Sequence, residues 1–71
     1  MATFGERVKS LRQAKGLTQK QMADALNITE RNYQRYEATN SPSNANLLRM
    51  ADFFDVSTDY LLGRSDDLTR H

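Results

Sequence analysis

Apolar side chains recur along this chain at intervals of three and four residues, which is the period of helices with one buried face. The pattern predicts a helix over residues 4–15, two short helices within 18–37, one over 44–54 and a short one within 57–63. No alternating run of apolar and polar residues and no hairpin dipeptide predicts a strand. The chain is therefore expected to be an all-α domain with five helices.

Polar residues at the expected helix ends support this division. Asn27 lies between the two short helices, and asparagine tolerates the left-handed conformation in which a helix ends and the chain turns sharply. Thr29 is the expected N-cap of the second short helix, Ser43 or Asn44 can cap the next one, and Gly63 is expected to close the last. Two pairs have the spacing of a capping box: Thr3 with Glu6, and Thr18 with Gln21.

The segment TQKQMADALNITERNYQRYE, residues 18–37, resembles the helix-turn-helix of the lambda-repressor-like family. This is the xenobiotic-response-element family of Cro/C1-type regulators from prokaryotes and phages. Residues 7–16 resemble the first helix of that family and residues 48–63 its last two helices. The resemblance implies a five-helix lambda-repressor-like DNA-binding domain over residues 1–63, with 64–71 as a polar C-terminal tail or the start of a linker.

Length and composition restrict the possible functions. A chain of 71 residues allows one domain, and no apolar run approaches the roughly 18 residues of a membrane helix. Cysteine is absent and the single histidine is the last residue, which disfavours thiolate metal sites and histidine-based catalysis. We therefore expect a cytoplasmic protein that is not an enzyme and has no metal, no cofactor and no membrane partner.

The charge is unevenly distributed, although the net value is only +1. Residues 1–36 hold seven basic and three acidic side chains, a net of +4, whereas the remainder holds three basic and six acidic side chains, a net of −3. An asymmetry of this kind orients one end of a protein toward a polyanion such as double-stranded DNA.

The outward face of the helix that begins after Thr29 is the part expected to enter the major groove, where base edges are distinguishable. An arginine can pair with guanine, a glutamine with adenine, and a glutamate can accept a hydrogen bond from cytosine. Glu30 can equally well stabilise the N-terminus of the helix through its interaction with the helix dipole. For the other side chains, the alternative is that they only form a solvated helix face. The base-reading candidates are Thr29, Glu30, Arg31, Gln34 and Arg35.

DNA phosphates are expected near the beginnings of two helices, because unpaired N–H groups at a helix start bind anions. In the family that the chain resembles, the glutamine matching Gln19 braces the DNA backbone. Capping and ordinary loop polarity are the alternatives for the candidates in the loop. The phosphate-binding candidates are Gln19, Lys20, Asn32, Asn40, Ser43 and Asn44.

Two further assignments concern the scaffold. Arg12 and Glu37 resemble a structural pair of this family, in which an arginine of the first helix reaches the glutamate at the end of the recognition helix. In the family that the chain resembles, a small aliphatic residue is usual at the position of Tyr33. We expect the Tyr33 ring in the core, and its hydroxyl could be packed or could reach solvent or DNA.

The sequence thus predicts a sequence-specific transcriptional regulator, a repressor that binds an inverted-repeat operator as a homodimer. Two recognition helices about 34 Å apart match successive major grooves. In proteins that the chain resembles, the fifth helix often helps the subunits meet, so the candidates for the dimer interface are Phe53, Tyr60 and Leu61. The alternative function is a protein-interaction module, such as the antitoxin of a toxin–antitoxin pair, which can use the same fold.

Overall fold

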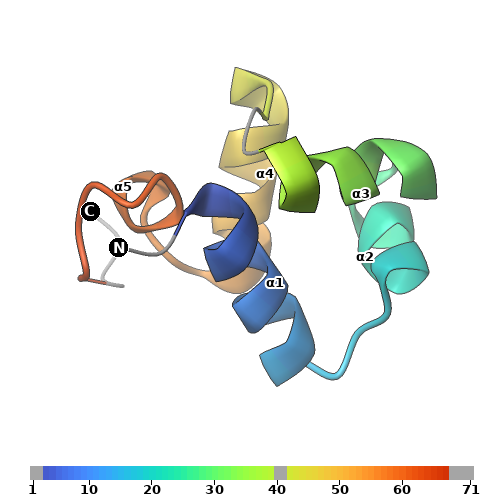
Figure 1. Ribbon diagram of the computed structural model, residues 1–71, viewed down its shortest axis with the longest axis horizontal. Coiled ribbons are helices and arrows are strands. Elements are labelled where there is room, and N and C mark those ends of the chain that lie inside the picture. The colour runs from blue at the N-terminus through green and yellow to red at the C-terminus, as the bar shows by residue number, and fades with distance from the viewer. Residues whose placement is uncertain (1–2, 40–41, 68–71) are drawn as a thin grey trace.

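Five helices make up the part of the chain that the structure describes, residues 3–39 and 42–67 of a computed structural model (Figure 1). No strand occurs within these residues, and the predicted all-α architecture with five helices is confirmed. None of the helices found there has the length and apolar character needed to cross a membrane. The helices are α1 (Phe4–Ala14), α2 (Gln19–Leu26), α3 (Glu30–Thr39), α4 (Asn44–Phe54) and α5 (Thr58–Leu61).

The first two helices begin with the predicted capping boxes. The Thr3 hydroxyl accepts a hydrogen bond from the Glu6 backbone N–H at 3.3 Å, and the Glu6 carboxylate accepts one from the Thr3 backbone N–H at 3.1 Å. Thr18 and Gln21 repeat the arrangement at 3.1 and 2.9 Å. These bonds satisfy backbone donors that have no partner inside a helix, and they place both starts at the residues expected from the sequence.

The turn between α2 and α3 is short because Asn27 adopts the left-handed conformation, with φ 58° and ψ 43°. Thr29 then accepts a hydrogen bond from the Asn32 backbone N–H at 3.1 Å, which is the predicted N-cap of α3. Asp55 ends α4 in the same left-handed conformation, which was not predicted from the sequence. Gly63, at φ 77°, follows α5 as expected.

Side chains from all five helices form the core. The Tyr33 ring is fully buried, so its predicted place in the core is confirmed, and Ala23 is 1% exposed in α2, the helix that contacts α3 most closely. The buried apolar residues are Phe4, Val8, Met22, Ala23, Leu26, Tyr33, Leu47, Met50, Ala51, Phe54, Val56 and Leu61.

Arg7 ties α1 to α5 and to the segment after it, a role that sequence analysis did not assign. The side chain is 7% exposed, and its guanidinium carbon lies 4.3 Å from the centre of the Tyr60 ring. It donates hydrogen bonds to the carbonyl oxygens of Tyr60 and Ser65 and to the carboxylate of Asp66, at 3.1, 2.9 and 2.7 Å. Part of the segment that was predicted as a polar tail is thus held against the first helix.

Candidate nucleic-acid interface

The helices α2 and α3 lie side by side at one end of the molecule, away from α5 (Figure 1). Their inner faces are apolar: Met22, Leu26 and Tyr33 are each 2% exposed or less. Because α3 also packs against α1, only one long face of this helix remains uncovered. The helix α3 therefore presents one polar face on a fixed support.

Four of the five base-reading candidates share that surface. Glu30, Arg31, Gln34 and Arg35 are all exposed, and at about 100° of rotation per residue Arg31 lies between Gln34 and Arg35. The fifth candidate, Thr29, is exposed at the beginning of the helix and already serves as its N-cap. Its hydroxyl hydrogen is still able to donate to an outside acceptor.

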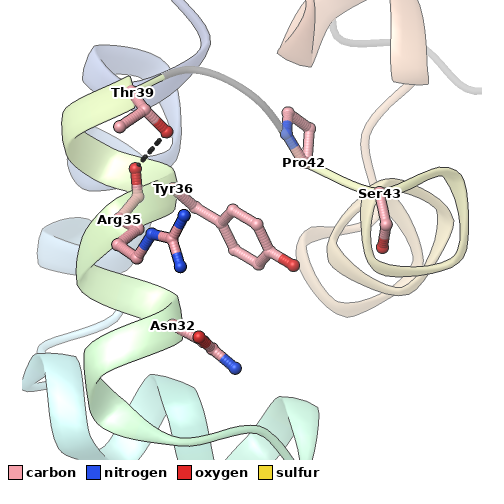
Figure 2. A pocket seen from close by; sticks show the side chains of 6 residues that line it. All are labelled: Asn32, Arg35, Tyr36, Thr39, Pro42 and Ser43. Carbon is pink, nitrogen blue, oxygen red and sulfur yellow. Dashed lines mark hydrogen bonds between the residues drawn. The ribbon is translucent and has the colours of Figure 1, made fainter.

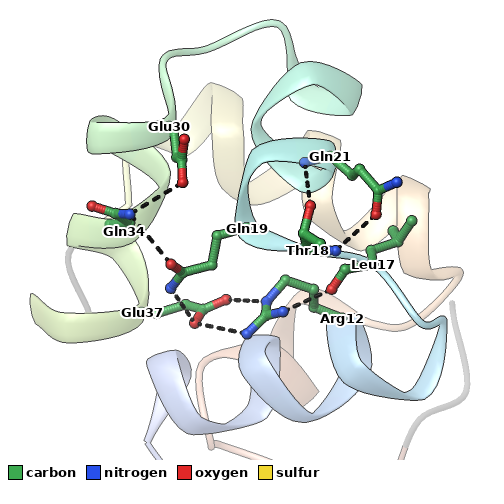
Figure 3. Close-up of polar contacts among 8 residues, drawn as sticks. All are labelled: Arg12, Leu17, Thr18, Gln19, Gln21, Glu30, Gln34 and Glu37. Carbon is green, nitrogen blue, oxygen red and sulfur yellow. Dashed lines mark hydrogen bonds and ion pairs between the residues drawn. The ribbon is translucent and has the colours of Figure 1, made fainter.

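A chain of hydrogen bonds runs from this surface into the scaffold (Figure 3). The Gln34 amide nitrogen donates to the Glu30 carboxylate and to the Gln19 amide oxygen, both at 3.3 Å. The Gln19 amide nitrogen donates in turn to the Glu37 carboxylate at 3.1 Å. Gln19, expected at a phosphate, thus uses both ends of its amide inside the protein and keeps one N–H for an outside acceptor.

Arg12 anchors the inner end of this chain, and the structure brings the predicted pair with Glu37 together (Figure 3). Its Nε donates to one Glu37 oxygen at 2.7 Å, its Nη2 to the other at 3.4 Å, and its Nη1 to the Leu17 carbonyl at 2.7 Å. The two side chains are only 10% and 7% exposed. One guanidinium therefore fixes the end of α3 and the chain entering α2.

The environment of the Glu37 carboxylate keeps it ionised. Burial alone would raise the pKa of Glu37, but the hydrogen bonds from Arg12 and Gln19 outweigh burial and hold this pKa below its usual range. The buried Tyr33 hydroxyl lies near the same carboxylate without a hydrogen bond of ordinary geometry, and burial, followed by the nearby carboxylate, raises the pKa of Tyr33. Tyr33 is thus a neutral neighbour of a charged pair.

The exposed face of α3 is bordered on one side by Gln19 of α2. On its opposite side lies a groove, where α3 meets the beginning of α4 (Figure 2). Its lining includes Asn32, Arg35 and Ser43, so two phosphate candidates and one base-reading candidate share one hollow. The Tyr36 ring reaches across, and its hydroxyl accepts a hydrogen bond from the Asn46 side-chain amide at 2.6 Å. This bond fixes the spacing of α3 and α4, and no spacing rule in the sequence indicates it.

Two helix starts hold three of the phosphate candidates, Lys20, Ser43 and Asn44. Lys20 is exposed in the first turn of α2, and Asn44 is exposed as the first residue of α4. Ser43 is the N-cap of α4, with its hydroxyl accepting from the Asn46 backbone N–H at 3.3 Å. Asn40 lies outside the described residues.

The structure corrects one of the three candidates for a subunit interface. Leu61 is fully buried in the core of a single chain and therefore has no surface to offer to a second copy. Phe53 and Tyr60 are half-buried: Lys15 Nζ lies 5.2 Å from the centre of the Phe53 ring, and Arg7 covers the Tyr60 ring. Their place in an interface remains a prediction.

Comparison with known proteins places this architecture among transcriptional regulators. The helix-turn-helix family model matches residues 8–61. The regulator ImmR of Bacillus subtilis is 42% identical over 65 residues, covering 90% of this chain and 51% of the relative. The phage CTXphi transcriptional repressor RstR of Vibrio cholerae is 40% identical over 60 residues, covering 83% and 54%. The chain thus spans about half the length of these relatives.

Two solved structures share the fold. A transcriptional regulator from Listeria innocua superimposes with a TM-score of 0.78 at 32% identity, covering 86% of this chain and 58% of that one. The P22 c2 repressor, solved with a synthetic operator, superimposes with a TM-score of 0.82 at 23% identity, covering 92% of this chain and all of that one. The chain belongs to the Cro/C1-type helix-turn-helix family, whose members are transcriptional regulators and not enzymes.

Proposed function

We propose that this chain binds double-stranded DNA sequence-specifically and acts as a repressor, reading an inverted-repeat operator through the major groove as a homodimer. The observation that carries the proposal is the uncovered face of α3, on which Glu30, Arg31, Gln34 and Arg35 are exposed. An α-helix with its side chains is about 10–12 Å across and fits a major groove about 12 Å wide.

The two sides of that face suit the DNA backbone. The first turn of α2, with Lys20, adjoins one side through the Gln19–Gln34 hydrogen bond, and the start of α4, with Ser43, adjoins the other through the groove. Helix starts offer backbone N–H groups to phosphates. A recognition helix placed in the groove would therefore have phosphate contacts on both sides to fix its position.

The number of recognition helices supports a dimer. The described residues contain one helix-turn-helix, formed by α2 and α3, whereas successive major grooves on one face of DNA lie about 34 Å apart, so one copy reads one groove. Two copies related by a two-fold axis would read the two halves of an inverted repeat. The relative RstR is a transcriptional repressor, which supports repression, and the P22 c2 repressor shows that this fold is compatible with operator binding.

Selection of bound fragments from genomic DNA at two salt concentrations, followed by binding titrations, tests this function. We expect enriched fragments with an inverted repeat, and Arg31→Ala should reduce their advantage over random DNA. Arg64→Ala is the matched control, because it removes an exposed arginine that follows α5, the helix at the other end of the molecule from α2 and α3 (Figure 1). Failure to enrich any fragment, or equal binding of enriched and random DNA, would refute the proposal.

A further inference from the structure

The hydrogen-bond chain that ends at Gln34 restricts what this side chain can read. We infer that Gln34 presents only its amide oxygen to DNA and distinguishes bases carrying an amino group from bases carrying a keto group. The inference rests on the proposed function, and it names the specificity of one residue within it. It differs from the usual reading of glutamine, which pairs with adenine through both its oxygen and its nitrogen.

The direction of every bond in the chain follows from its two ends. Glu37 and Glu30 are carboxylates, which accept hydrogen bonds and donate none when ionised. The atom of Gln19 that faces Glu37 at 3.1 Å must therefore be its amide nitrogen, which turns the Gln19 oxygen toward Gln34. The atom of Gln34 that faces both this oxygen and Glu30 must then be its amide nitrogen as well.

Reversing either amide is unfavourable for the same reason. A reversed Gln34 would place its oxygen 3.3 Å from two other acceptor oxygens, and a reversed Gln19 would place its oxygen against the Glu37 carboxylate. Arg12 holds that carboxylate in a fixed position, with bonds to both of its oxygens. The orientation of an exposed amide is thus set by a buried ion pair.

An amide nitrogen has two hydrogens, and the Gln34 nitrogen has two acceptors at 3.3 Å, the Gln19 amide oxygen and the Glu30 carboxylate, so we assign one hydrogen to each. Only the amide oxygen remains for DNA, and it accepts from the exocyclic amino groups of adenine and cytosine. Guanine and thymine present keto oxygens at the corresponding positions of the major groove, which repel it. Gln19 and Glu30 act here as positioning residues.

The experiment first locates the base that Gln34 faces and then measures all four bases there. A selected site is obtained with the wild-type chain, and the position whose preference disappears in Gln34→Ala is the one to test. The wild-type chain should bind adenine and cytosine within about threefold of each other, and guanine and thymine about three- to tenfold more weakly, as one hydrogen bond allows. Helical circular dichroism of each variant checks that it is folded.

Freeing one N–H of Gln34 should change the pattern in a way that loss of structure would not. In Glu30→Ala and in Gln19→Ala that hydrogen can reach adenine N7, so adenine should become preferred over cytosine by about three- to tenfold. Arg64→Ala, the control, removes an exposed arginine that follows α5 and should leave the adenine-to-cytosine ratio at this position unchanged.

The outcomes separate the two proposals. If no site is selected, the proposed function fails. If a site is selected but no position responds to Gln34→Ala, the inference alone fails. It also fails if wild type already separates adenine from cytosine as strongly as amino from keto bases, or if both positioning variants keep the wild-type ratio.

Discussion

Removal of the Arg12 side chain tests the anchor beneath the recognition helix. Arg12→Ala would leave the Glu37 carboxylate, 7% exposed, without its cation and the Leu17 carbonyl without its donor. Breaking a buried ion pair from one side costs about 3–5 kcal/mol. A domain of this length has a total stability of roughly 4–11 kcal/mol, so the variant should lose a large share of it.

The pH dependence of this loss carries a definite sign. In the wild type the folded-state pKa of Glu37 lies below its unfolded value, so its stabilisation is fully present above the unfolded pKa and is lost as pH falls through the folded pKa. Arg12→Ala removes the strongest interaction that opposes burial, so the folded-state pKa of Glu37 should rise relative to wild type. The ionised Glu37 carboxylate then destabilises the folded variant at neutral pH, and its protonation in acid removes this cost. The difference in free energy of unfolding between wild type and variant should therefore narrow between about pH 7 and about pH 4.

Urea unfolding followed by helical circular dichroism, at several pH values, measures that gap. The difference between the two proteins is the quantity to use, because Glu6, whose pKa is lowered by hydrogen bonds from Thr3, titrates in both. Arg49→Ala, which removes an exposed arginine of α4, is the control and should change stability by less than about 0.5 kcal/mol. A gap below about 1 kcal/mol, or one that widens in acid, would refute this account of the pair.

Three other changes test the site, the turn and the core. Arg31→Ala should relax sequence preference, whereas Lys20→Ala should weaken binding to all sequences and reduce the salt slope by about one; the reverse pattern in binding titrations would exchange their roles. Asn27→Ala should cost about 1–2 kcal/mol in urea unfolding, because alanine is strained at φ 58°, while Asn27→Gly should cost nothing measurable; equal losses would contradict the conformational reason. Leu61→Ala should cost about 2–5 kcal/mol of stability; weakened self-association in sedimentation with unchanged stability would instead return this residue to a subunit interface.

The features predicted from the sequence alone are those whose partners lie a few residues apart. The capping boxes at Thr3 and Thr18 join residues three positions apart, and the turn at Asn27 depends on the conformational preference of one residue. The pairing of Arg12 with Glu37 spans 25 residues, and only the resemblance to a known family indicated it.

Polar contacts between residues far apart in the sequence could not be predicted in the same way. The partners of Arg7 lie 53 to 59 residues away, and nothing in its surroundings in the sequence distinguishes it from a solvated lysine or arginine. The hydrogen bond between Asn46 and Tyr36 depends on how α4 is placed against α3, which apolar spacing does not fix. Leu61 was assigned to an interface because the resemblance implies that the fifth helix helps the subunits meet, and a short helix does not reveal from its sequence which side is covered.

The buried ion pair has a consequence that stability alone does not explain. Replacing both Arg12 and Glu37 by methionine would remove two desolvated charges, and such replacements are often neutral or stabilising. The folded domain would survive, but Gln19 would lose the acceptor that orients its amide, and the direction of the bonds to Gln34 would no longer be fixed. We therefore expect the double variant to unfold at the same urea concentration as the wild type. Its binding should nevertheless prefer adenine over cytosine, as expected for Glu30→Ala and Gln19→Ala. If a stable double variant still binds adenine and cytosine within about threefold of each other, as expected of the wild type, the orientation of Gln34 does not depend on the pair.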